Sequence, residues 1–277
     1  MTMYSLAHLT VLDLPPPEVA RVAADAGFDA FGLRLHPVRP GEVAPPVHGD
    51  TPMRRELLAI MKGTGVQFFD VEAFRLDRTI DFGAIEKTFE AAARLGASNA
   101  LVFVDERDID VASDLYARFC DLARQHDLDA CLEFMPWLGI SSLDAALSMV
   151  RTVACSNAKI LLDALHFFRS LTPLDRLREL DPGLMNYVQI CDAPLTAPAT
   201  LDAIANEARF ERLYPGEGEL PVVEFLAALP DGLVVAPEVA TARLAKDVSG
   251  AERAAYALAT SRQVVAQMHA HRSQQGK

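Results

Sequence analysis

The sequence predicts a single (β/α)8 barrel of the TIM type, and three observations lead to this fold class. Eight apolar stretches of strand length alternate with stretches of helical periodicity along the 277 residues, which is the element order of such a barrel. No linker or change in composition divides the chain, so we expect one domain over residues 1–270 and a polar tail over residues 271–277. No glycine-rich turn follows the first strand, which argues against a doubly wound dinucleotide-binding sheet.

The predicted strands are short apolar runs bounded by turn residues. Runs of this kind, with few polar residues inside them, indicate strands that are buried on both faces of a parallel sheet. In chain order, the strands are predicted at residues 4–11, 30–35, 66–74, 99–104, 128–134, 159–163, 184–191 and 232–239.

The predicted helices have apolar residues every three or four positions. Pro15 to Pro17 suit the first turn of the first helix, and Gly27, Gly65 and Gly96 suit helix ends. In chain order, the helices are predicted at residues 15–26, 52–61, 82–95, 109–126, 141–150, 173–180, 220–229 and 251–268. The segment 37–50 is rich in proline and glycine and is predicted to be a loop.

Composition limits the classes of partner. The chain has 26 Lys and Arg against 38 Asp and Glu, a formal charge of −12, which disfavours binding to nucleic acid or to an anionic membrane. No signal-like leader or apolar stretch of membrane-spanning length is present, so a cytoplasmic protein is expected. The four cysteines lack metal-binding spacing and are predicted to be free thiols. A homo-oligomer is compatible with the sequence.

Polar residues at the ends of four consecutive strands point to a metal site. Glu133, Asp163, Gln189 and Glu238 all fall at strand ends, and in a barrel these ends meet on one face. Buried carboxylates that crowd together repel one another unless a cation is bound. Oxygen ligands favour Mn²⁺ or Mg²⁺, with Zn²⁺ or Co²⁺ as alternatives. Unrelated salt bridges to nearby arginines remain the alternative interpretation.

Other residues near these strand ends are candidates for catalysis and substrate binding. His166, close after Asp163, can carry a proton or bind a hydroxyl group. A guanidinium pair before the Pro-Gly-Glu-Gly turn can bind a carboxylate or phosphate. We therefore predict catalytic roles for Glu133, Glu238 and His166, and substrate contacts from His166, Arg209, Arg212, Trp137, Glu72, Arg75 and His8. A buried ion pair remains an alternative for Glu72 and Arg75.

Four segments resemble the sugar phosphate isomerase/epimerase family of the xylose-isomerase-like TIM barrel superfamily. They are residues 132–137 (LEFMPW), 162–169 (LDALHFFR), 188–193 (VQICDA) and 212–220 (RLYPGEGEL). The resemblance implies a Glu-Asp-His-Glu metal set, in which Glu133, Asp163 and Glu238 supply the carboxylates and His166 contacts substrate. Gln189 stands where many members have histidine. In having a glutamine at this position, the chain is similar to some bacterial 3-dehydroshikimate dehydratases of the superfamily.

The predicted chemistry is metal-assisted removal of a proton next to a carbonyl group. The first expectation is an isomerase or epimerase acting on a keto-sugar or related small molecule through an enediolate. The alternative is a dehydratase of the 3-dehydroshikimate type, and this function is favoured if Arg209 and Arg212 line the pocket. A neutral, hydrogen-bonding mouth would favour sugar isomerisation. A nuclease similar to endonuclease IV and a non-catalytic binding barrel are the less favoured alternatives.

Overall fold

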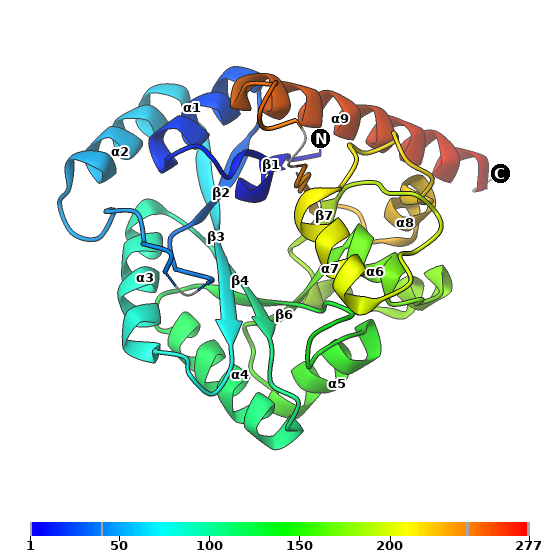
Figure 1. The fold of residues 1–277 in the computed structure, drawn as a ribbon, viewed down its shortest axis with the longest axis horizontal. Coiled ribbons are helices and arrows are strands. Elements are labelled where there is room, and N and C mark those ends of the chain that lie inside the picture. Colours follow the sequence, from blue (N-terminus) through cyan, green and yellow to red (C-terminus); the bar gives the residue numbers. More distant parts are fainter. Residues whose placement is uncertain (1, 40, 242–243, 276–277) are drawn as a thin grey trace.

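Eight parallel strands pair in chain order in the computed structural model, which describes residues 2–39, 41–241 and 244–275. A bridge between Tyr4 and Val235 brings the last strand back to the first, so the predicted barrel is confirmed (Figure 1). The strands are β1 (Ser5–Leu6), β2 (Ala30–Arg34), β3 (Gln67–Leu76), β4 (Asn99–Val104), β5 (Asp129–Glu133), β6 (Ala158–Asp163), β7 (Tyr187–Ile190) and β8 (Val234–Pro237).

Helices surround the strands as a ring (Figure 1). Thr51, Asp81 and Ser142 begin helices by accepting hydrogen bonds from backbone amides of the first turn. The helices are α1 (Pro16–Ala26), α2 (Pro52–Thr64), α3 (Phe82–Leu95), α4 (Ile109–Arg124), α5 (Leu143–Val153), α6 (Ala164–Arg169), α7 (Leu201–Phe210), α8 (Val222–Ala228) and α9 (Gly250–Gln275). No helix in the described part of the chain is long and apolar enough to span a membrane.

The structure differs from the sequence prediction in several elements. Strand β1 covers only two residues, and the 3-10 helix η1 (His8–Val11) replaces the rest of the predicted strand. The helix predicted at 173–180 is the 3-10 helix η2 (Leu174–Glu179), and a further 3-10 turn, η3 (Pro182–Leu184), follows it. Helix α9 continues to Gln275, so most of the predicted polar tail is helical, while residues 276–277 lie outside the described residues.

Two helices that carry site residues were not predicted. Helix α6 begins directly after β6, because the Asp163 side chain accepts a hydrogen bond from the His166 backbone amide and caps the helix. With only six residues, α6 is too short to show helical periodicity. Helix α7 is capped by Thr200 and lies in the long connection between β7 and α8.

The apolar core has two parts that together fix the strand ends. The larger part lies between the sheet and the helices, and the smaller part fills the barrel interior. The interior part consists of Ala73, Leu101, Phe103, Cys131, Leu161, Tyr187, Val234 and Ala236. Several polar side chains are nevertheless buried near the carboxyl ends of the strands, and these residues form the candidate site.

Candidate active site

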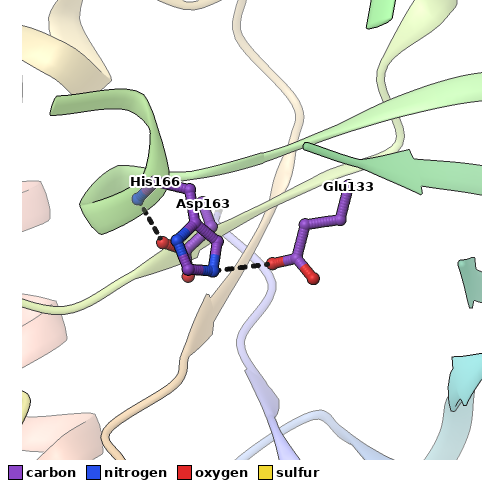
Figure 2. Close-up of side chains that lie close together, drawn as sticks. All are labelled: Glu133, Asp163 and His166. Atoms are coloured by element: carbon purple, nitrogen blue, oxygen red, sulfur yellow. Dashed lines mark hydrogen bonds and ion pairs between the residues drawn. The ribbon is translucent and has the colours of Figure 1, made fainter. Parts of the chain in front are cut away.

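Three predicted residues meet at the carboxyl ends of β5 and β6. Glu133 ends β5, Asp163 ends β6, and His166 lies in the first turn of α6 (Figure 2). His166 Nε2 lies 3.7 Å from Glu133 Oε1. In the described part of the chain, these residues form the one group of three or more acidic, histidine or cysteine side chains whose ligand atoms lie within 4.8 Å of one another. All three residues are buried, with exposed fractions of 3% or less.

Arg212 holds two of the predicted metal ligands. Its Nη1 lies 2.6 Å from Asp163 Oδ2, and its Nη2 lies 3.0 Å from Glu238 Oε2. Burial alone would raise the pKa of Asp163, but the charge of Arg212 and the contacts with His166 hold it below its usual value. Asp163 is therefore ionised at neutral pH.

Gln189 is also bound to Glu238. Gln189 Nε2 donates to Glu238 Oε1 at 3.1 Å, so both carboxylate oxygens of Glu238 have a partner. The four predicted metal ligands are thus divided in this structure. Glu133 and Asp163 lie beside His166, whereas Gln189 and Glu238 are hydrogen-bonded to each other.

Two buried oxygens of the predicted metal site have no hydrogen-bond partner. They are Oε1 of Glu133 and Oε1 of Gln189. Burial, followed by the negative charges of Glu238 and Asp163, raises the pKa of Glu133 well above its usual value. A divalent cation would pair these oxygens and allow Glu133 to ionise, so the residues present fit such an ion. Glu133, Asp163, Gln189 and Glu238 are the residues that could hold it.

His166 is neutral in this environment. Burial lowers its pKa to about 4, with the charge of Asp163 opposing and that of Arg212 adding to the shift. Its Nδ1 is buried without a hydrogen-bond partner, and its Nε2 faces Glu133. The Trp137 ring meets the imidazole edge-on, with 5.2 Å between ring centroids. His166 Nε2 also lies 3.5 Å from Arg212 Nη2, so the neutral imidazole contacts a tryptophan, a carboxyl group and a guanidinium.

Glu72 lies at the site, but it does not form the ion pair with Arg75 that was the alternative interpretation. Its Oε1 accepts from the His8 backbone amide at 2.9 Å, and its Oε2 is buried without a partner. Gly32 makes room for this carboxyl group, because a Cβ at that position would lie 2.3 Å from Glu72 Oε1. Arg75 does not pair with Glu72 and instead forms ion pairs with Asp77 and Asp105. The alternative of a Glu72–Arg75 ion pair is therefore wrong.

The predicted contribution of His8 also differs in the structure. Its side chain is buried, accepts from the Arg34 backbone amide through Nδ1 at 2.9 Å and lies 3.2 Å from the Leu14 carbonyl through Nε2. His8 does not line the cavity described next. Its backbone amide, rather than its ring, reaches the site through Glu72.

A cavity of about 200 Å³ opens above these residues and is rich in arginine. It is below the roughly 300–1,000 Å³ typical of pockets for drug-sized ligands, so it suits a small molecule. Glu72, Glu133, His166 and Glu238 lie on its wall, together with Trp137 and several apolar side chains. The arginines that line it are Arg34, Arg39, Arg75, Arg209 and Arg212.

Arg209 is the best candidate for an anion contact at the mouth of the cavity. Burial, followed by the charges of Arg39 and Arg75, lowers its pKa. Its guanidinium lies 5.8 Å from the centre of the Trp137 ring. In the described residues, neither Arg209 nor Arg39 has a carboxylate within ion-pair distance. Sequence reasoning missed Arg34 and Arg39, although the position of Arg34 at the end of β2 was an available signal.

The glycine-rich turn between α7 and α8 is held by Asp192 rather than aimed at the cavity. Asp192 accepts from the backbone amides of Gly216 and Leu220, both at 3.0 Å. A Cβ at Gly218 would lie 2.4 Å from Asp192 Oδ1, so only glycine fits there. The neighbouring Gln189 binds Glu238 rather than Asp192. The turn follows Arg212 in the chain, and residues 215–218 do not line the cavity described above.

Comparisons with known proteins agree with this architecture. A family model described as xylose isomerase-like TIM barrel matches residues 20–257. No curated protein sequence matches the chain.

Solved structures are similar over nearly the whole chain. The IolI protein with bound zinc is 17% identical, with a TM-score of 0.81, and the match covers 96% of this chain and 99% of that protein. The probable 3-DHS dehydratase AsbF from Bacillus anthracis is 19% identical, with a TM-score of 0.71 and coverage of 91% and 97%. D-psicose 3-epimerase crystallised with D-fructose is 14% identical, with a TM-score of 0.69 and coverage of 95% and 99%. At these identities the similarity shows the fold.

Proposed function

Because the chain belongs to the xylose isomerase-like TIM barrel family, we propose that it is a divalent-metal-dependent dehydratase. In this proposal, the enzyme removes a proton next to the carbonyl group of a small anionic hydroxyketone and expels the hydroxyl group one carbon further along. A substrate of the 3-dehydroshikimate type, a cyclic hydroxyketone with a carboxylate, has this chemistry. The sequence alone favoured an isomerase or epimerase, and the cavity is the reason for the change of order.

The arginines of the cavity favour an anionic substrate. Arg209 and Arg39 have no carboxylate partner in the described residues, and the charge of Arg39 contributes to lowering the pKa of Arg209. Convergent guanidinium groups of this kind bind a carboxylate through charge-assisted hydrogen bonds. This was the condition under which the sequence favoured dehydration over sugar isomerisation. A neutral sugar would leave these charges uncompensated.

The observation that carries the reaction is the difference between Glu133 and Glu238. Glu133 Oε1 is free of hydrogen bonds and faces His166, whereas both oxygens of Glu238 are engaged by Gln189 and Arg212. Epimerisation needs two groups that exchange protons on opposite faces of one carbon. Glu133 and His166 lie side by side on the cavity wall, and one such proton-handling pair is enough for elimination.

The family fold and the donor set support a metal cofactor. A divalent ion held by Glu133, Asp163, Gln189 and Glu238 would keep these carboxylates ionised and would stabilise negative charge on the substrate carbonyl oxygen. The similar IolI protein has bound zinc. Zn²⁺ therefore joins Mn²⁺, Mg²⁺ and Co²⁺ as a candidate ion for this site.

In this proposal, the residues around the cavity bind the substrate and transfer the proton. Arg209 and Arg39 bind the substrate carboxylate, and Trp137 forms a flat wall against the ring. His166 accepts the carbon-bound proton at Nε2, and the adjacent Glu133 carboxylate stabilises the imidazolium that results. His166 then returns the proton to the departing hydroxyl, which leaves as water. The proton and the hydroxide together account for the water released.

An isomerase or epimerase acting on an anionic keto-sugar remains the second candidate. It shares the first step with the dehydratase, and the similar D-psicose 3-epimerase supports this alternative. In that case the proton returns to carbon, and no water is lost.

The test is a screen in deuterated water with added Mn²⁺ or Zn²⁺, followed by proton NMR. Keto-sugars, keto-inositols and 3-dehydroshikimate are the compounds to offer. The proposal expects deuterium exchange and a dehydrated product from the carboxylated cyclic ketone. A Glu133→Gln variant should lose the exchange, whereas Glu56→Gln, which alters a surface ion pair with Arg21, should retain it. Equal exchange in a folded Glu133→Gln variant would refute the proposal.

A further inference from the structure

A buried ion pair outside the cavity joins the two helices that carry the site residues. Arg169 ends α6, and Glu207 lies in α7, with side chains that are 1% and 6% exposed. Arg169 Nε donates to Glu207 Oε2 and Nη2 donates to Oε1, both at 2.8 Å, so the contact is bidentate. Neither residue lines the cavity. The pair therefore has no direct contact with substrate.

The same guanidinium also fixes the chain that follows β7. Its Nη2 donates to the Pro194 carbonyl at 2.8 Å, and its Nη1 donates to the Leu195 carbonyl at 3.5 Å. Arg169 thus connects three segments, namely α6, the connection after β7 and α7. Figure 1 shows α6 and α7 side by side at this edge of the barrel.

Each of the two helices joined by the ion pair also carries functional side chains. Helix α6 carries His166, three residues before Arg169. Helix α7 carries Arg209, which is two residues after Glu207 and thus turned by about 200° around the helix axis. Arg212 is tied to the same helix, because its Nε donates to the Ala208 carbonyl at 2.7 Å. A rotation of α7 would therefore displace both arginines relative to His166.

A buried ion pair is a costly way to hold two helices together. Taking two charges out of water offsets most of their attraction, and an apolar pair of similar size often stabilises as well. A bidentate guanidinium–carboxylate contact does, however, allow only a narrow range of geometries. The pair is thus better suited to setting an orientation than to raising stability.

We infer that Arg169 and Glu207 are positioning residues for substrate recognition. They fix the orientation of α7 relative to α6, so that Arg209 and His166 both contact Trp137. This inference rests on the proposed function in one respect, which is that Arg209 binds the anionic group of the substrate.

Trp137 provides a direct readout of this arrangement. It is the single tryptophan of the chain. Its ring meets His166 with centroids 5.2 Å apart, and the Arg209 guanidinium lies 5.8 Å from its centre. A change in the angle between α6 and α7 alters both contacts. The fluorescence of Trp137 therefore reports the orientation without any need for a substrate.

The experiment compares Arg169→Lys and Glu207→Gln with a matched control, Arg272→Lys. Arg272 also donates to backbone carbonyls, those of Leu226 and Ala227, and pairs with a carboxylate, but it lies on α9 and does not line the cavity. We expect a shifted Trp137 emission maximum in the first two variants and none in the control. Unchanged emission in folded Arg169→Lys and Glu207→Gln would overturn the inference, whatever the substrate is.

A second measurement separates positioning from general damage. The probe is shikimate, a cyclic polyol carboxylate that lacks the ketone, titrated against Trp137 fluorescence. We expect its affinity to fall at least tenfold in both variants, while the affinity for Mn²⁺, measured by electron paramagnetic resonance, changes less than twofold. An equal loss of both affinities would show a merely structural role.

A double-mutant comparison tests whether the pair acts through Arg209. In an Arg209→Gln background, adding Arg169→Lys should cause no further loss of shikimate affinity. If the losses of shikimate affinity from the two substitutions multiply in the double variant, the inference is overturned. If the single variants do not fold, Arg169→Met/Glu207→Leu leaves no buried charge and carries the same expectations. Absence of deuterium exchange with any ketone would refute the proposed reaction and would leave the fluorescence result to decide the positioning role.

Discussion

Arg212 donates to Asp163 through a contact of 2.6 Å, and the two residues are 2% and 0% exposed. The same guanidinium lies 3.0 Å from Glu238. One arginine thus balances two of the carboxylates that the sequence identified as metal ligands. A divalent ion that uses Asp163 and Glu238 must share them with Arg212 or displace it.

Replacing Arg212 should make the stability of the protein depend on metal. In Arg212→Gln, Asp163 and Glu238 lose their counter-ion, and breaking a buried pair in this way costs about 3–5 kcal/mol. Added Mn²⁺ or Zn²⁺ can restore the missing positive charge, so it should raise the melting temperature more in the variant than in the wild type. Thermal unfolding with and without metal measures the difference. Equal metal-induced shifts in the two proteins would mean that Arg212 is not a counter-ion of the metal ligands.

Glu133 and Asp163 should respond differently to loss of charge. Glu133→Gln removes a buried carboxyl group that has no hydrogen-bond partner at Oε1, so the metal-free protein should be as stable as the wild type or more stable. Asp163→Asn leaves Arg212 without its nearest carboxylate and should be destabilised. Proton exchange on the ketone should fall by roughly 10² or more in Glu133→Gln. Urea unfolding and NMR exchange test the two expectations separately.

Ionisation of the Asp70 carboxyl group should lower the free energy of unfolding as the pH rises. It is buried beneath the site, and burial, followed by the charge of Glu238, raises its pKa to about 7 from the ordinary 3.8. Between these values the folded protein binds more protons than the unfolded chain, so this contribution is complete below pH 3.8 and is lost as the pH rises through 7.

Replacement by asparagine removes this pH-dependent loss. At pH 8, Asp70→Asn should be more stable than the wild type by up to about 4 kcal/mol, with a much smaller gain at pH 5. Urea denaturation at the two pH values measures the difference. A gain in stability of the same size at both pH values would show that ionisation of Asp70 is not the cause.

The sequence located the metal-ligand candidates because their positions follow from the fold class alone. Glu133, Asp163 and Glu238 follow apolar strands, and the ends of parallel strands in a barrel meet on one face. The actual partner of Asp163 could not be predicted in this way. Arg212 reaches it from the connection that contains α7, and the course of that connection depends on contacts such as that between Arg169 and Glu207.

His8 should make the protein sensitive to mild acid. Burial lowers the pKa of its imidazole to about 4 from the ordinary 6.5, with the Leu14 carbonyl opposing the shift and the charge of Arg34 adding to it. Between these values the unfolded chain binds the extra proton, so stability falls as the pH drops from 6.5 towards 4, by up to about 3 kcal/mol. In His8→Gln, the unfolding free energy should change less between pH 7 and pH 5. An unchanged slope would assign the acid sensitivity to other groups, of which His166 is the first to examine.

Arg209 should decide between anionic and neutral substrates. Its guanidinium lies at the mouth of the cavity and has no carboxylate partner in the described residues, so a substrate carboxylate is the expected partner. Loss of one charged hydrogen bond corresponds to roughly a 10- to 100-fold loss of binding. In Arg209→Gln, KM for 3-dehydroshikimate should therefore rise by about that factor. The kcat should change little, because Glu133 and His166 are untouched. The exposed Arg178→Gln serves as the control for loss of one positive charge, and a neutral keto-inositol should be handled equally by both variants. A rise in KM of the same size for the neutral compound would show that Arg209 shapes the cavity rather than recognising the anion.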